Sequence, residues 1–387
     1  MHTGLSRRNM IKGSVALAAT ALARYPLSSF GFPEPEAGAT LIPFLDQQPV
    51  SKDPMLRWEQ LKSWITPNDQ CFHVQHYGVP DFDVDQWRLE ISGLVRSPKT
   101  LTLAELKSRR RKSVIATLEC SGNSSSSGFA GAIGNVQWTG TPLAPLLRES
   151  GLLDRGTEVV FFGNDEKIEK IRDKDYLQNF ARSLSRDDAF RDDVLLAYEM
   201  NGLPLPKSHG APLRLVVPGW FGITWVKWLA RIEVLDRRYM SKYMAREYVT
   251  IRGEEKDGRA TWRETSVGPI DLKSITARAA RLSSGTVRLT GAAWTDGTPL
   301  RAVELKIDDG PWRATQLDTK QRAKYAWTFW SYDWKSPEPG EHTLVSRALD
   351  AEGRVQPPPD DPGIKLKQTY WEANQQWPRK IRISAGA

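Results

Sequence analysis

The stretch from Val114 to Leu143 reads VIATLECSGNSSSSGFAGAIGNVQWTGTPL. Its first residues form a β-rich run that leads directly into Cys120, and a loop of Ser and Gly follows. A cysteine at the end of a buried strand, opening into a loop, is well placed to bind a soft metal ion through its thiolate. The alternative is that a lone cysteine serves only as a small buried hydrophobic residue.

A second informative stretch runs from Leu195 to Val234 and reads LLAYEMNGLPLPKSHGAPLRLVVPGWFGITWVKWLARIEV. It contains His209, Arg214 and Lys227 among apolar segments. We expect these three side chains to supply charge-assisted hydrogen bonds to an anionic ligand. The alternative is that they are basic residues on a solvated surface.

Length and charge exclude several classes of protein. With 387 residues the chain suits two domains, and its 40% hydrophobic and 26% charged residues are typical of a globular protein. The formal net charge is +8, and the acids and bases are interspersed, so we expect no nucleic-acid partner. An excess of this size favours an anionic cofactor or an acidic protein partner.

The N-terminus resembles an export signal. Arg7 and Arg8 precede a mild apolar run of about eleven residues that ends in Ala21-Leu22-Ala23. A membrane-spanning helix needs about twenty residues, so we predict a twin-arginine signal peptide at 1–23 and a periplasmic protein exported in the folded state. The alternative is a chance arginine pair on an ordinary secretory signal.

The rest of the chain divides into three regions that differ in composition and in the pattern of apolar residues. Residues 24–59 are rich in Pro and Gly and predict an extended arm. Over 60–262, short apolar runs alternate with turns and a few helical stretches, one of which begins at Leu101 with Leu103 and Leu106 on its buried face. This mixture predicts an α+β domain. Over 263–387, strand-like runs recur about every ten residues between Gly or Pro turns, which predicts an Ig-like antiparallel β-sandwich.

Cysteine and histidine usage limits the cofactor chemistry. Cys71 and Cys120 are the two cysteines of the chain, and a disulfide between them is possible in an oxidising compartment. The sequence has no C-x-x-C-H haem site, no G-x-G-x-x-G after a strand, and five histidines in total. A c-type haem, a Rossmann dinucleotide site and a metal site of several histidines are therefore not expected.

Both long stretches resemble the signatures of the sulfite oxidase family of molybdenum enzymes. That family's first signature reads roughly L-x-C-A-G-N, then G-A-I, then a Trp and a Gly before a Leu. The counterparts here are Leu118, Cys120, Gly122, Asn123, 131–133, Trp138, Gly140 and Leu143. The second signature matches at 198–202, His209, Gly210, Pro212, Arg214, Pro218, Gly219, Gly222 and 226–228. The C-terminal strands are similar to the family's dimerisation domain, so the resemblance covers roughly residues 60 to 380 and implies a possible homodimer.

The resemblance implies a molybdopterin cofactor, no haem domain, and a molybdenum ion bound by Cys120. Tyr248 lies in a segment similar to the one with the family's active-site tyrosine, so both Cys120 and Tyr248 are expected to be catalytic. The implied cofactor-binding residues are Gln75, His76, Asp165, His209, Arg214, Val226 and Lys227. His76 as a core histidine, Asp165 as a turn residue and Tyr248 as a core tyrosine remain the alternatives.

This sequence departs from the family where arginines bind the substrate. Val74-Gln75 stands where Arg-Asn is usual, Ser124 and Ser125 stand where arginines are usual, and Thr224-Trp225 stands where Arg-His is usual. Burying a dianion without paired cations is costly. The substrate is therefore either sulfite, with cations from elsewhere in the chain, or a less charged S- or N-oxo compound such as a sulfoxide.

The expected activity is oxygen-atom transfer at molybdenum, with electrons passing to an external carrier such as a c-type cytochrome or a membrane quinol dehydrogenase. A third hypothesis is an exported Ig-like binding protein without a metal. No segment beyond the signal peptide is expected to enter a membrane.

Overall fold

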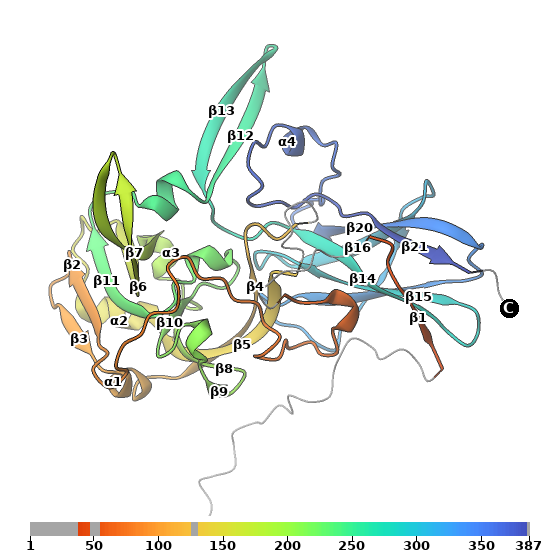
Figure 1. Cartoon of the computed structure of the whole chain (residues 1–387). Coiled ribbons are helices and arrows are strands. Elements are labelled where there is room, and N and C mark those ends of the chain that lie inside the picture. Colours follow the sequence, from red (N-terminus) through yellow and green to blue (C-terminus); the bar gives the residue numbers. More distant parts are fainter. Residues whose placement is uncertain (1–37, 47–54, 125–130, 385–387) are drawn as a thin grey trace, which may run out of the picture.

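The computed structural model of the protein describes residues 38–46, 55–124 and 131–384. The chain forms two lobes that lie side by side (Figure 1). The predicted signal peptide and parts of the predicted arm, residues 24–37 and 47–54, lie outside the described residues.

The first sheet of the N-terminal lobe has five strands. In spatial order they are β3 (Lys99–Leu101), β2 (Leu89–Gly93), β11 (Leu229–Leu235), β6 (Glu158–Ile171) and β7 (Lys174–Ser185). β2 and β11 run parallel, and the other neighbours run antiparallel. Leu89 and Ile91 point into the core while Glu90 is exposed, as expected of a strand with one buried face.

The second sheet carries the loop with Cys120. Its strands are β10 (Arg214–Val216), β8 (Leu195–Met200), β5 (Ile133–Pro142) and β4 (Lys112–Glu119), with β9 (Leu203–Pro204) pairing β8. Nearly every residue of β5 is buried, and a Cβ at Gly140 would lie 2.1 Å from the Leu196 carbonyl oxygen. β4 and β5 pair antiparallel with Glu119 opposite Ile133, so the loop between them begins at the sheet edge with Cys120.

Short helices connect these sheets. They are α1 (Leu103–Lys107), α2 (Leu143–Ser150), α3 (Arg186–Ala189), and the single turns η1 (Trp58–Gln60), η2 (Lys207–His209), η3 (Gly222–Thr224) and η4 (Lys242–Arg246). The helix predicted from Leu101 begins after Thr102, which forms a capping box with Glu105. Leu106 is fully buried and Leu103 half-buried, so the predicted face is confirmed. The mixed α+β fold of this lobe is likewise confirmed.

The C-terminal lobe is the predicted antiparallel β-sandwich. One sheet contains β1 (Thr40–Ile42), β14 (Lys273–Arg281), β15 (Val287–Trp294), β19 (Thr328–Trp334) and β18 (Gln316–Leu317). The other contains β17 (Arg313–Ala314), β16 (Leu300–Ile307), β20 (Gly340–Asp350) and β21 (Arg379–Ile383). Alternate residues such as Val303, Leu305 and Leu344 fill the core between the sheets.

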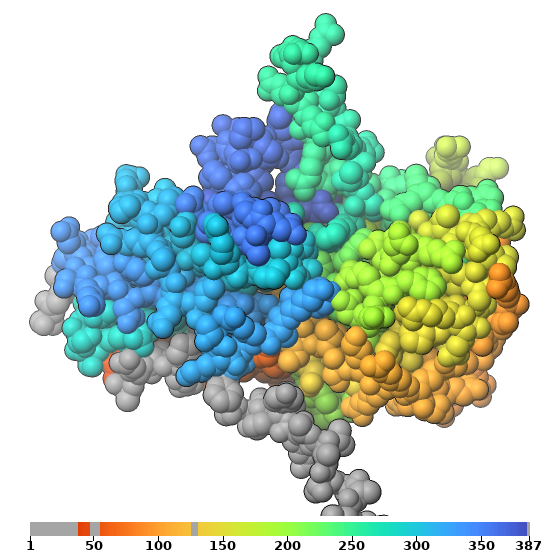
Figure 2. Space-filling view, turned by 180° about the vertical axis from the view of Figure 1, so that it is seen from behind, coloured from red at the N-terminus to blue at the C-terminus, as the bar shows by residue number. Residues whose placement is uncertain are grey.

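A hairpin joins the lobes and projects from the molecule. It consists of β12 (Val249–Lys256) and β13 (Arg259–Ser266), and it stands clear of the body in Figures 1 and 2. The predicted boundary between 262 and 263 falls inside β13, and the sandwich strands resume with β14. Halfway along the hairpin, Gly253 N–H donates to the Leu366 carbonyl at 2.7 Å, just after α4 (Pro362–Lys365).

One of the two hydrophobic cores contains residues of both lobes. Trp58 of η1 stacks on Trp294 of β15 with ring centroids 5.8 Å apart, and Thr117 of β4 donates its backbone N–H to the Tyr325 carbonyl at 2.8 Å. The residues that hold the Cys120 loop therefore come from both lobes. Within the described part of the chain, no helix is long and apolar enough to cross a membrane.

Candidate active site

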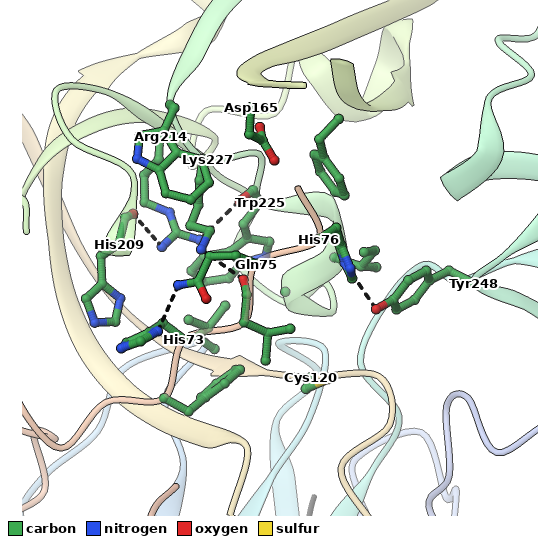
Figure 3. Close-up of a pocket in the computed structure, with 17 residues that line it drawn as sticks. His73, Gln75, His76, Cys120, Asp165, His209, Arg214, Trp225, Lys227 and Tyr248 are labelled. Atoms are coloured by element: carbon green, nitrogen blue, oxygen red, sulfur yellow. Dashed lines mark hydrogen bonds between the residues drawn. The ribbon is translucent and has the colours of Figure 1, made fainter. Parts of the chain in front are cut away.

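A cavity with about 670 Å³ of empty volume opens beside the end of β4 (Figure 3). Its walls come from segment 72–76, β4, β6, β7, the turns η2 and η3, and Tyr248. All of the predicted site residues except Val226 line it: Gln75, His76, Cys120, Asp165, His209, Arg214, Lys227 and Tyr248. Residues that are up to 173 positions apart, from Gln75 to Tyr248, are thus brought to one cavity.

Cys120 presents a free thiol to this cavity. It follows the last residue of β4, and its N–H donates to the Ala132 carbonyl at 2.9 Å. Cys71 is buried elsewhere and also free, so the possible disulfide is not formed. Burial raises the pKa of the Cys120 thiol to about 11, an effect opposed by the Gly122 N–H. A metal ion that binds here must therefore displace the thiol proton.

Basic side chains gather on the opposite side of the cavity from Tyr248 (Figure 3). Arg214 donates to the carbonyls of His209 and Trp225 at 3.0 and 3.1 Å. Lys227 donates to the carbonyls of Val74 and Ser208 at 2.9 and 3.1 Å. A Cβ at Gly210, whose φ is +104°, would lie 2.8 Å from the Lys227 Cβ, so only glycine permits this approach.

Arg214 and Lys227 lie near one carboxylate, that of Asp165, which interacts electrostatically with Lys227. Among the described residues, neither Arg214 nor Lys227 forms a salt bridge, and the Nε of Arg214 is buried without a hydrogen-bond partner. Burial and the neighbouring Arg214 lower the pKa of Lys227 to about 7, while Asp165 opposes this shift. Buried cations without anions are unfavourable unless a ligand supplies the missing charge. The cavity is therefore complementary to a polyanion.

His209 differs from the expectation of a charged donor. Its ring is buried and lies edge-on to His73, with 5.6 Å between centroids. Burial, reinforced by Arg214, His73 and Lys227, lowers the pKa of His209 to about 3. His209 is therefore neutral at pH 7, and only Arg214 and Lys227 can offer charge-assisted hydrogen bonds.

Asp165 supplies an unused acceptor on the same wall. It follows the bulge in β6, where the pairing with β7 shifts between Phe162 and Glu166. Its Oδ1 is buried and accepts no hydrogen bond, and burial raises the pKa of the carboxyl group to about 7. A ligand with N–H groups would satisfy this atom.

Tyr248 and His76 form the other wall. The Tyr248 hydroxyl and the His76 Nε2 lie 3.2 Å apart, and Tyr248 has a φ of 55°. Such a backbone conformation is unfavourable for a tyrosine and clusters at functional sites. Burial lowers the pKa of His76 to about 4, and burial raises the pKa of Tyr248, so both side chains are neutral at pH 7.

Two aromatic residues of the C-terminal segment, Tyr370 and Trp371, lie against this wall. Neither was predicted as a site residue from the sequence. Trp371 stacks on Tyr248 with centroids 4.2 Å apart, and Tyr370 contacts Trp371 at 4.0 Å. A Cβ at Gly122 would lie 2.9 Å from the Tyr370 ring, which places that ring beside the Cys120 loop. They were not predicted because they lie more than 120 residues after Tyr248 in the sequence.

At two further residues, Val226 and His73, the lining of the cavity differs from the expectation. Val226 is fully buried in the hydrophobic core and does not line the cavity. Its backbone pairs with Leu215 instead, whose N–H donates to the Val226 carbonyl at 2.8 Å. His73 was not predicted, yet it lines the cavity and its Nδ1 lies 2.8 Å from the Gln75 Nε2.

Some of the positions that lack the family's arginines lie at the cavity. Val74 and Trp225 line it, and Thr224 is fully buried beside them. Ser124 is buried in the loop after Cys120, and Ser125 lies outside the described residues. The described lining also contains apolar and aromatic side chains, among them Leu118, Ile223 and Phe180.

Comparison with known proteins identifies the domains. The family model described as an oxidoreductase molybdopterin binding domain matches residues 76–243, and that of a Mo-co oxidoreductase dimerisation domain matches residues 267–371. Mitochondrial sulfite oxidase from Homo sapiens is 31% identical over 323 residues, which is 76% of this chain but only 58% of the human protein. Sulfite oxidase from Gallus gallus is 30% identical over 321 residues, covering 76% of this chain and 68% of that protein.

A solved structure shares the whole architecture. The sulfane dehydrogenase SoxCD from Paracoccus pantotrophus matches with a TM-score of 0.71 and 26% sequence identity, covering 99% of this chain and 100% of that chain. Both domain families, the sulfite oxidase relatives and this structure agree with the cavity and its free cysteine. The chain belongs to the sulfite oxidase family of molybdopterin-dependent oxidoreductases.

Proposed function

We propose that the protein is an oxidoreductase of the sulfite dehydrogenase type that uses a molybdenum-molybdopterin cofactor and passes electrons to an external carrier such as cytochrome c. One observation carries this proposal. The free thiol of Cys120 and the cations Arg214 and Lys227, which form no salt bridge with any described residue, line a single cavity.

The residues present fit the cofactor. A thiolate suits molybdenum, and Arg214 and Lys227 offer the positive charge that the phosphate of a molybdopterin needs. The unpartnered Oδ1 of Asp165 is an acceptor for pterin N–H groups. No group of three or more His, Cys, Asp or Glu that could hold a metal occurs in the described residues.

When bound, the cofactor supplies two-electron oxygen-atom transfer. The chain contributes position and polarity. Tyr248 keeps its proton, because burial raises its pKa, and its hydroxyl can therefore donate to an oxygen of the substrate. Neutral His76, 3.2 Å away, orients that hydroxyl without adding charge. Phe180 and Trp371 pack around His76 and Tyr248 and exclude water from the reacting oxygen.

A second substrate class is favoured by the lining near Cys120. Val74, Ile223 and Phe180 offer no charge there, and His76 is neutral. Binding a sulfite dianion at such a wall would leave charge unpaired, which is costly. A neutral S- or N-oxo compound, such as a sulfoxide, avoids this cost. The structural neighbour named sulfane dehydrogenase supports a sulfur substrate other than sulfite within this fold.

The experiment is a two-way assay of the mature protein purified from a host that makes molybdopterin. Sulfite-dependent reduction of cytochrome c supports the first substrate class. Sulfoxide-dependent oxidation of a reduced viologen dye, with no turnover of sulfite, supports the second. A purified protein that contains no molybdenum would contradict both and would revive the hypothesis of a metal-free binding protein.

Location and assembly follow the same proposal. Paired Arg7 and Arg8 before an apolar run support export to the periplasm by the twin-arginine route, which carries folded proteins. The match of residues 267–371 to a dimerisation domain supports a homodimer that forms through the β-sandwich. Fractionation of cells and light scattering of the purified protein test these two points separately.

A further inference from the structure

The carboxylate of Glu119 lies directly before Cys120 and is completely buried. Lys273 Nζ donates to its Oε1 at 2.6 Å, and Trp294 Nε1 donates to its Oε2 at 2.8 Å. Asn123 Nδ2 also donates to Oε1, at 3.0 Å. Both oxygens of the carboxylate are therefore satisfied, and two of these three donors come from the C-terminal lobe.

The same groups close the loop that carries Cys120. Lys273 Nζ donates to the Asn123 carbonyl at 3.1 Å, and Asn123 N–H donates to the Cys120 carbonyl at 2.9 Å. Lys273 and Trp294 are directly paired across β14 and β15, so the sandwich ladder holds the two donors side by side. Two rigid strands of one lobe thus fix a turn of the other.

A buried ion pair is a costly way to hold two lobes together, because a well-packed apolar pair is often as stable. What the charged pair adds is a defined geometry, since each hydrogen bond has a preferred direction and length. That geometry is imposed on the residue next to the thiol. Hydrogen bonds behind a metal ligand fix its orientation in the same way.

We propose that Lys273 and Trp294 are positioning residues that hold Cys120 in place for molybdenum through Glu119, so that the β-sandwich acts directly on the metal-binding loop. The metal-binding role of Cys120 comes from the proposed function, while the clamp formed by Glu119, Lys273 and Trp294 can be tested without it. Arg379 provides the matched control, because it is a fully buried cation of the same lobe, paired with Asp46 and Glu59.

The first test measures hydrogen exchange by mass spectrometry in the cofactor-free full-length mature protein. In Lys273→Met and Trp294→Phe, we expect the amides of residues 118–124 to exchange at least threefold faster than in the wild type. Arg379→Met should leave this peptide unchanged even though it lowers the melting temperature. Unchanged exchange of residues 118–124 in Trp294→Phe, which keeps the charges and an aromatic ring, would overturn the proposal even if Lys273→Met failed to fold.

The second test uses the molybdenum-loaded protein. We expect Trp294→Phe to alter the electron paramagnetic resonance spectrum of the half-reduced metal, and Lys273→Met to retain at least threefold less molybdenum. Arg379→Met should match the wild type in both measurements. Wild-type spectra and metal content in both clamp variants would show that Lys273 and Trp294 only stabilise the fold. A wild-type protein without molybdenum would end the proposed function, and the exchange test would then decide the clamp alone.

Discussion

Arg214 holds in place the residue whose protonation it opposes. Its Nη1 donates to the His209 carbonyl at 3.0 Å, while its positive charge adds to the burial that lowers the pKa of the His209 ring to about 3. The backbone contact places the two residues together, and the electrostatic effect keeps one of them neutral. The cavity thereby holds its positive charge on Arg214 and Lys227.

This arrangement predicts acid sensitivity of the cofactor-free protein. Between pH 6.5 and about 3, an unfolded His209 binds a proton that the folded protein excludes. The free energy of unfolding must then fall as the pH falls through this window, by up to about 1.4 kcal/mol per pH unit. Urea unfolding between pH 7.5 and 4.5 should show a shallower fall in His209→Gln than in the wild type.

His342 supplies the control for this prediction. Burial lowers its pKa, but the hydrogen bonds that it donates to Asp308 and to the Glu338 carbonyl, together with the nearby carboxylate charges, raise the pKa overall. Its stabilisation is therefore present below pH 6.5 and is lost as the pH rises through the raised pKa. His342→Gln should therefore steepen the fall in stability toward acid pH or leave it unchanged. Equal slopes in the wild type and His209→Gln would contradict the buried, neutral state of His209.

Substitutions of the two cysteines are expected to have very different effects on activity. Cys120→Ser should abolish turnover, because a serine hydroxyl does not supply the soft thiolate. Cys71→Ala should keep the metal and lower the free energy of unfolding by about 1 kcal/mol. Cys71 is buried, and the substitution removes only one packed sulfur atom. Activity assays, metal analysis and thermal unfolding of both variants check this. Unchanged turnover in Cys120→Ser would refute the assignment of the metal ligand.

The sequence predicted the fold well because the deciding features were local. The apolar face formed by Leu103 and Leu106 requires only neighbouring residues, and the structure contains the helix that it indicates. Most of the site was also found, because Cys120 and Arg214 lie within two long characteristic stretches.

What the sequence could not show depends on contacts between distant segments. Trp371 covers Tyr248 from 123 residues further along the chain, and Lys273 reaches Glu119 across the interface between the lobes. The neutral state of His209 depends on burial, which residue type alone does not reveal. Val226 lies between Trp225 and Lys227, two residues that line the cavity, but its own side chain lies in the hydrophobic core, so its contact with the cofactor stays a prediction.

Tyr248→Phe tests the proposed hydrogen-bond donor. The substitution removes the hydroxyl 3.2 Å from His76 but keeps the ring that stacks on Trp371. We expect kcat to fall roughly 10²-fold, the typical loss for one oriented donor at a reacting oxygen, with unchanged molybdenum content. Tyr243→Phe alters the same aromatic cluster, but its hydroxyl interacts with Tyr77, so its kcat should change less than threefold. Equal kcat values for the two variants would remove Tyr248 from the reaction.

Val74→Arg tests whether the lining near Cys120 selects substrates by charge. Val74 is half-buried at the cavity and carries no charge, so an arginine there would offer a charge-assisted hydrogen bond to an anionic substrate. Such a bond is worth about 1.5–3 kcal/mol before the cost of burying the guanidinium, so we expect KM for sulfite to fall about tenfold. For a neutral sulfoxide, kcat/KM should fall, because the added side chain fills space without a new partner. Val74→Met adds volume without charge, so it should weaken the binding of both substrates. If Val74→Arg and Val74→Met changed the KM for sulfite in the same way, charge at this wall would not determine the substrate.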